Sequence, residues 1–185
     1  MSSPRRADAV RNRALALEAA TALLSEPGAT LTVEAIAARS GLGAGTVVRA
    51  FGGKDALIDA AVAALLAPVV ARAGELAASK APGEALRAFL AELMDFQAAH
   101  HGLSAGLDGL DLPGTTARRA DLEAAVGDLI ARAQRDGELR DDLPVGALTV
   151  LIGRTAFAVA RDGSPELSAA YLTVLFAGLS PVHGR

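Results

Sequence analysis

The chain has 185 residues, which is enough for one or two domains with a sizeable buried core. Hydrophobic residues make up 51% and aromatic residues only 3%, so the expected interior is rich in Ala, Leu and Val and suits closely packed helices. The lack of cysteine excludes disulfides, thiol catalysis and thiolate metal sites, and residues 1–6 precede no apolar run of the secretory type, so we expect a cytoplasmic protein.

The formal net charge of −3 by itself argues against a nucleic-acid binder, but the charges are unevenly distributed. Residues 1–54 carry seven basic and four acidic side chains, whereas residues 55–185 carry eleven basic and seventeen acidic ones. A basic first part on an acidic remainder is the pattern expected when one end of a protein binds a polyanion.

The first helix is predicted from Arg11 to Ser25, and Pro27-Gly28 would end it. Residues 1–9 are expected to form an arm, in which Arg5 and Arg6 either reach DNA or remain solvated. The buried stripe of the helix is predicted to comprise Ala14, Leu17, Ala20 and Leu24.

Two short helices joined by a glycine turn are predicted next. Val33–Arg39 has helical spacing, with Thr32 in the N-cap position. Gly41 can adopt the positive φ that a sharp turn needs, and a second helix runs from about Ala44 to Ala50. This arrangement describes a helix-turn-helix, whose second helix lies in the major groove of DNA.

The predicted DNA contacts lie on this second helix and beside it. Thr46 can bind a phosphate or a base, and Arg49 can contact a guanine or a phosphate through its forked guanidinium. Lys54, at the start of the following helix, is placed to meet the DNA backbone. The predicted DNA-binding set is Thr32, Ala44, Gly45, Thr46, Val48, Arg49 and Lys54.

A connecting helix is predicted from Lys54 to about Gly74, with a kink or a new turn at Pro68. Its segment 56–66 is strongly apolar, but a membrane span needs about 20 uninterrupted apolar residues. Because Asp59, Pro68 and Arg72 interrupt the run, we expect no membrane partner.

Further helices are predicted at Pro82–His101, from Thr115 or Thr116 to Asp136, at Leu143–Arg161 and at Ser164–Leu179, with a short helix within Leu103–Pro113. Period-two alternation is confined to residues 31–33, so the predicted class is all-α, with about nine helices. A three-helix DNA-binding helix-turn-helix domain would occupy residues 1–54, and an effector-binding and dimerisation domain residues 55–185.

The last predicted helix pair is more apolar than the surface of one protomer tolerates. Burial against a second copy is the simplest account, because a two-fold interface lets one patch cover itself. The predicted dimer-interface set is Ile152, Ala156, Val159, Leu172, Leu175 and Phe176.

A ligand pocket would lie between helices of the second domain, lined by apolar side chains with a few polar groups. The polar side chains best suited to orient a ligand are Gln97, His100 and Tyr171, and the scarcity of aromatic residues favours a small or aliphatic compound. The candidates, of which no more than half are expected to face a ligand, are Phe89, Leu93, Phe96, Gln97, His100, Leu107, Val126, Phe157 and Tyr171.

One group of side chains suggests catalysis or metal binding: Glu92, Asp95, His100, His101, Asp108 and Asp111. However, adjacent histidines on a helix point about 100° apart, and no His-x-x-x-His or Glu-x-x-His spacing occurs. A pair of histidines at the negative end of a helix dipole is the simpler interpretation. We therefore predict no enzyme, no metal and no cofactor.

The pattern Ile36–Leu42, Gly45–Val47, Phe51 and Lys54–Leu57 resembles the N-terminal domain of TetR-family transcriptional repressors. The resemblance covers about 45 residues, since Ala19-Ala20, Leu23-Leu24, Glu26, Gly28 and Leu31–Val33 continue it, and Ala131–Leu143 is similar to the C-terminal domain of some actinobacterial-type members. It implies a homodimer formed by the last two helices as a four-helix bundle, a double-stranded DNA operator and a small-molecule effector that releases the operator.

The chain departs from the TetR pattern within the second helix. Members usually carry Ser, Tyr and His where this chain has Gly43, Val48 and Ala50. These departures imply fewer polar contacts with DNA. A protein of the same fold that binds a ligand or a partner, with weakened or lost operator recognition, therefore remains the alternative.

Overall fold

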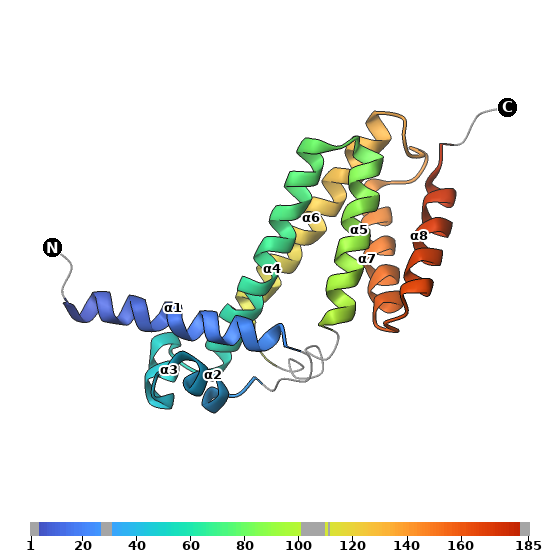
Figure 1. Ribbon diagram of the computed structural model, residues 1–185. Coiled ribbons are helices and arrows are strands. Elements are labelled where there is room, and N and C mark those ends of the chain that lie inside the picture. Colours follow the sequence, from blue (N-terminus) through green and yellow to red (C-terminus); the bar gives the residue numbers. More distant parts are fainter. Residues whose placement is uncertain (1–3, 27–30, 101–109, 111, 182–185) are drawn as a thin grey trace. The chain divides into compact units, whose positions relative to one another are not determined.

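The computed structural model describes residues 4–26, 31–100, 110 and 112–181. These residues form eight helices and no strand (Figure 1). The helices are α1 (Pro4–Leu24), α2 (Val33–Ser40), α3 (Ala44–Phe51), α4 (Lys54–Ser79), α5 (Pro82–Ala99), α6 (Pro113–Arg135), α7 (Val145–Ala160) and α8 (Pro165–Leu179). The predicted all-α class is confirmed. The short ninth helix predicted within residues 103–113 lies almost entirely outside the described residues.

Two predicted helix boundaries are wrong by more than two residues, the start of the first helix and the end of α4. The first helix begins at Pro4, so residues 4–9 are helical and do not form an arm; proline suits a first helical turn because its missing N–H would have no partner there. Helix α4 continues through Pro68 to Ser79. The Pro68 ring is exposed, and the helix buries Leu65 before it and Ala73 after it, so packing on both sides outweighs the lost hydrogen bond. Helix α6 begins at Pro113.

The chain forms two compact units, which we call the head and the body. The head comprises the described residues of 1–67 and 102–118, and the body those of 68–101 and 119–181. Helices α4 and α6 each begin in the head and end in the body.

In the head, α1 packs against α2 and α3, and α2 packs against α3 (Figure 1). The buried positions of α1 are mostly alanines, which allow helices to approach closely. Ala14, predicted on the buried stripe, is exposed instead, and Leu17 is half-buried. The buried apolar side chains of the three helices are Ala16, Ala19, Ala20, Leu24, Ile36, Ala37, Val47 and Phe51.

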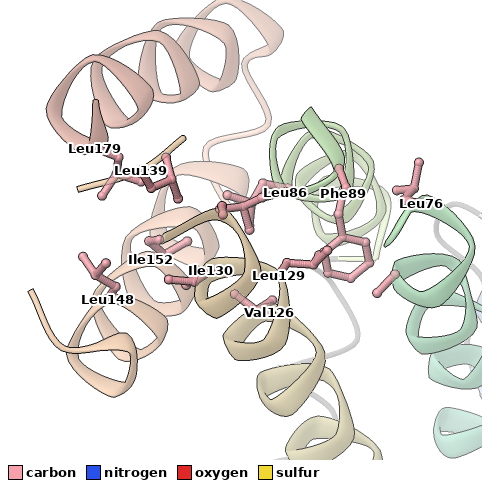
Figure 2. Packing of buried hydrophobic residues seen from close by; sticks show 14 of the residues in the cluster. Leu76, Leu86, Phe89, Val126, Leu129, Ile130, Leu139, Leu148, Ile152 and Leu179 are labelled. Atoms are coloured by element: carbon pink, nitrogen blue, oxygen red, sulfur yellow. The ribbon is translucent and has the colours of Figure 1, made fainter. Parts of the chain in front are cut away.

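In the body, buried side chains from α4, α5, α6, α7 and α8 form one apolar cluster (Figure 2). Phe89 of α5 and Leu129 of α6 lie in it with Leu76 of α4, and Ile152 of α7 with Leu148. Full burial of one such side chain stabilises the fold by about 1.5–3 kcal/mol. The cluster therefore holds helices together that are far apart in the sequence.

By length and composition alone, α4 could cross a membrane, and it is the only described helix of which this is true. Its most apolar window has a mean hydropathy of 1.8, and 33% of that window is buried inside the protein. A core helix of a soluble protein gives the same signal.

Candidate nucleic-acid interface

Two local interactions fix the start and the end of α2. Thr32 Oγ1 accepts a hydrogen bond of 3.1 Å from Ala35 N and so caps α2, as predicted. Gly41 has φ of 68° and ends the helix, with its N–H and that of Leu42 both donating to Ala37 O. A residue with a Cβ is strained at this φ, so the glycine sets the angle at which the chain enters α3.

Helix α3 is attached to the head through one side and exposes the other. Val47 and Phe51 are buried, whereas Ala44, Gly45 and Arg49 are exposed. The predicted DNA contacts Thr46 and Val48 are half-buried. Because residues four apart share a helix face, Gly45 and Arg49 form an exposed strip away from the buried anchors, whereas Ala44 is exposed because it is the first residue of the helix. An exposed strip on a short, well-anchored helix is what insertion into a major groove requires.

The two remaining residues of the predicted DNA-binding set lie at helix starts. Thr32 is half-buried, and its oxygen is engaged in capping α2, which leaves the hydroxyl proton available to a phosphate. Lys54 is the exposed first residue of α4.

Arg13 makes a contact that the sequence did not indicate. Its Nη1 donates a hydrogen bond of 2.7 Å to Ala50 O, and its guanidinium carbon lies 4.0 Å from the centre of the Phe51 ring. The carbonyls of a last helical turn lack intrahelical partners and carry the negative end of the dipole, so an arginine suits this place. Arg13 thereby ties α1 to the end of α3. The two partners are 37 residues apart in the sequence, so no local sequence pattern predicts this contact.

Two arginines of the head are paired with neighbouring carboxylates. Arg11 pairs with Asp8 at 3.2 Å and Arg39 with Glu26 at 2.5 Å. Within the described part of the chain, Arg49 and Lys54 form no ion pair. Their positive charge is therefore available to a polyanion.

Asp59 of α4 caps the start of α6, again without a signal in the sequence. Its Oδ1 accepts a hydrogen bond of 2.7 Å from Thr115 N, and its Oδ2 one of 2.8 Å from Gly114 N. Burial of the carboxyl opposes its ionisation, but the two backbone hydrogen bonds outweigh this effect and lower the pKa of Asp59. Gly114 is needed because a Cβ there would lie 2.9 Å from Asp59 Oδ2. The carboxylate joins two helices that both continue into the body.

The predicted effector-pocket residues fall into several groups. Phe89, Leu93 and Val126 are buried in the main body cluster. Phe96 and His100 stack with their ring centroids 4.4 Å apart, and His100 Nδ1 lies 2.7 Å from Phe96 O. His100 is the C-cap of α5, which agrees with a histidine at the negative end of a helix dipole.

Two further pocket candidates lie on the last helices. Tyr171 Oη forms a hydrogen bond of 2.7 Å with Thr155 Oγ1, and burial raises the pKa of the Tyr171 phenol. Phe157 is 39% exposed, with the Arg161 guanidinium 5.9 Å from its ring centre, so it does not join the buried candidates. Leu107 lies outside the described residues.

Gln97 carries an unusual polar atom. Its side-chain oxygen Oε1 is buried and has no hydrogen-bond partner among the described residues. A buried amide oxygen without a partner costs about 1–3 kcal/mol, so a group that donates to it would stabilise the body.

The predicted dimer residues are not all on the surface. Ile152, Ala156 and Phe176 are buried within the protomer, because they pack in its own clusters. These three side chains therefore do not belong to the exposed surface of the protomer. Val159, Leu172 and Leu175 are half-buried. The large apolar residues exposed on the same two helices are Val150, Leu151, Phe157, Leu167 and Val174.

Within the described residues, no three His, Asp or Glu side chains come together in a way that could hold a metal. His101, Asp108 and Asp111 of the acidic and histidine group considered above lie outside those residues.

The exposed, anchored second helix defines the class: a DNA-binding helix-turn-helix protein with a separate helical body. Residues 16–61 match the family model for bacterial regulatory proteins of the tetR family. Residues 81–181 match the model for the C-terminal domain of SbtR-like transcriptional regulators. The chain therefore belongs to the TetR family of transcriptional regulators.

Solved structures agree. A TetR transcription regulatory protein from Mycobacterium vanbaalenii is 36% identical over 96% of this chain and 99% of that one, with a TM-score of 0.68. A TetR regulator from Streptomyces coelicolor is 29% identical over 92% and 99%, with a TM-score of 0.67. FadR from Bacillus subtilis, solved in complex with stearoyl-CoA, shares the fold at 18% identity over 90% and 98%, with a TM-score of 0.70. Comparison with curated proteins found no match.

Proposed function

We propose that this protein is a cytoplasmic, homodimeric repressor that binds a palindromic operator and leaves it when a small molecule occupies the body. The observation that carries the proposal is the exposed strip of α3, with Arg49 outward and the anchors Val47 and Phe51 inward. In a dimer, two such helices would enter successive major grooves, about 34 Å apart. The DNA-binding part is residues 1–54 and the effector and dimer part residues 55–185.

The unpaired Gln97 Oε1 supports a ligand site in the body, because a ligand donor would satisfy it. The hydrogen-bonded Tyr171 and the stacked His100 are further polar groups of the same unit. FadR, which has this fold, carries stearoyl-CoA in its solved complex. An effector would act only to the extent that it binds the DNA-free arrangement more tightly than the DNA-bound one.

Dimerisation is proposed through the exposed apolar face of α7 and α8. Leu151 is 57% exposed and Val174 73% exposed, which is costly for large apolar side chains gathered on two adjacent helices. A two-fold interface would cover this face with its own copy.

The test is fluorescence anisotropy of the purified protein with its own upstream intergenic DNA and with a scrambled duplex, over a salt series. Selective binding that weakens steeply with salt is expected, because phosphate contacts release counterions. Arg49→Ala should lower operator affinity by about 1–3 kcal/mol and leave the dimer intact. Glu123→Ala, at an exposed body position, is the control. Unchanged binding by Arg49→Ala would refute the assignment of the groove-facing strip.

The alternative, a protein that binds a ligand or a partner without operator recognition, is favoured by one observation. Gly43 caps α3 without a side-chain hydrogen bond, and no hydroxyl or imidazole stands at Val48 or Ala50. Val48→Tyr should raise DNA affinity if these departures cost contacts. No selective DNA binding by the wild-type protein would favour the alternative.

A further inference from the structure

Helices α1 and α3 together line an open hollow at the surface of the head. The hollow has a volume of about 350 Å³, and its polar lining residues are Arg6, Asn12 and Arg13 of α1 and Thr46 and Arg49 of α3. Arg6 and Arg13 lie seven residues apart, about two helical turns, and so share one face of α1. The small Ala50 side chain leaves the space between the helices open.

The charged residues that line this hollow are all basic, and they lie beside three apolar residues, Ala9, Val10 and Ala50. Three of the residues that line it are arginines, two supply neutral polar groups, and none is acidic. The nearest acidic residue of α1, Asp8, is engaged with Arg11, and neither residue lines the hollow. Arg6 forms no ion pair within the described part of the chain, and Arg13 uses one nitrogen on Ala50 O, which leaves other N–H groups of its guanidinium unused.

We infer that this hollow seats the sugar-phosphate backbone of the DNA strand flanking the groove that α3 enters. The inference rests on the proposed function and adds α1 to the DNA-binding surface, with Arg6 as a phosphate contact. Arg13 is a positioning residue, since it also holds the end of α3. Phosphate is the chemistry that arginine guanidinium groups lining one site recognise, and Asn and Thr side chains are common additional donors to it. Continuity with Arg49 on α3 identifies the occupant as DNA.

The experiment measures the salt dependence of binding for matched charge removals on the same helix. Arg6→Gln removes a charge from the hollow, and Arg11→Gln removes one from the outside of it. Each phosphate contact contributes about 0.9 to the slope of log affinity against log salt. Arg6→Gln should lower the slope by about that amount and weaken intergenic and scrambled duplexes by the same factor, whereas Arg11→Gln should leave the slope unchanged.

The outcomes separate this inference from the proposed function. If the wild-type protein binds DNA selectively and Arg6→Gln keeps the wild-type slope, α1 makes no phosphate contact and the inference is wrong, while the regulator stands. An equal loss of slope in both variants would show a general charge effect and also overturn it. If the wild-type protein binds neither duplex at low salt, the proposed function and the inference both fail. Circular dichroism at the working temperature checks that both variants are folded.

Discussion

Removal of the Asp59 carboxylate tests the connection between α4 and α6. Asp59→Ala leaves Gly114 N and Thr115 N without the acceptors that now lie 2.8 and 2.7 Å away. Loss of a helix cap costs about 0.5–2 kcal/mol, and one hydrogen bond to a charged group contributes about 1.5–3 kcal/mol. Because the site is half-buried, water can make some of the lost hydrogen bonds. We therefore expect Asp59→Ala to lower the free energy of unfolding by about 2 kcal/mol. For a chain of this size that is about 4–8 °C in Tm.

The stabilisation by Asp59 should depend on pH, and the direction of its pKa shift determines how. The folded-state pKa of Asp59 is lowered by its hydrogen bonds, so the folded state binds this proton less readily than the unfolded chain. The stabilisation is complete above the unfolded pKa, near 3.9, and is lost as pH falls through the folded pKa. The difference in stability between the wild-type protein and Asp59→Ala should therefore be largest near neutral pH and shrink below about pH 4.

Thermal unfolding followed by circular dichroism at equal protein concentrations is the assay, since dimerisation makes Tm depend on concentration. Asp55→Ala is the control, because Asp55 is exposed on the same helix and should lose only a dipole interaction of about 0.5 kcal/mol. Equal shifts for the two variants, or a difference that grows at low pH, would refute the account of the Asp59 cap.

Other variants give further tests. Arg13→Gln should destabilise the protein by about 1 kcal/mol through loss of the bond to Ala50 O and of the ring contact, and weaken DNA binding, as measured by thermal melting and anisotropy. Gly41→Ala should lower the free energy of unfolding by about 1 kcal/mol, because Gly41 has a φ of 68°. Gly146→Ala should raise it by about 0.5 kcal/mol, because Gly146 lies within α7 and a Cβ there would meet open space. Equal melting shifts for the two variants would contradict this. Leu151→Glu should yield monomers in sedimentation velocity, and an intact dimer would exclude this face.

Local rules predicted the helix-turn-helix well. Thr32 and Gly41 act through bonds to residues three or four positions away, so their roles are readable in the sequence. The contacts of Arg13 and Asp59 were not readable, because their partners lie 37 and 55 residues away and depend on how helices pack.

In the last two helices, the pattern of apolar residues predicted less well which side chains are buried. Helices α7 and α8 are apolar on most of their faces, so periodicity could not separate Ile152, which is buried, from Leu151, which is exposed. The same ambiguity led to core residues being assigned to the dimer face. Pro68 likewise predicted a kink or a new turn from local rules, whereas α4 continues through it as one helix.

The amino-acid sequence by itself determined the helical class and the capped turn before α3, because these depend on interactions within one or two turns of the chain. Its residue pattern also identified the TetR family. The tertiary structure alone decided which apolar residues are core and which basic residues remain available. It also decided which distant groups meet, including Arg13 with α3, Asp59 with α6, and Arg6 with the hollow beside Arg49. Such pairs form only when packed helices bring the two side chains together. Because the partners are far apart in the sequence, no local pattern predicts the contact.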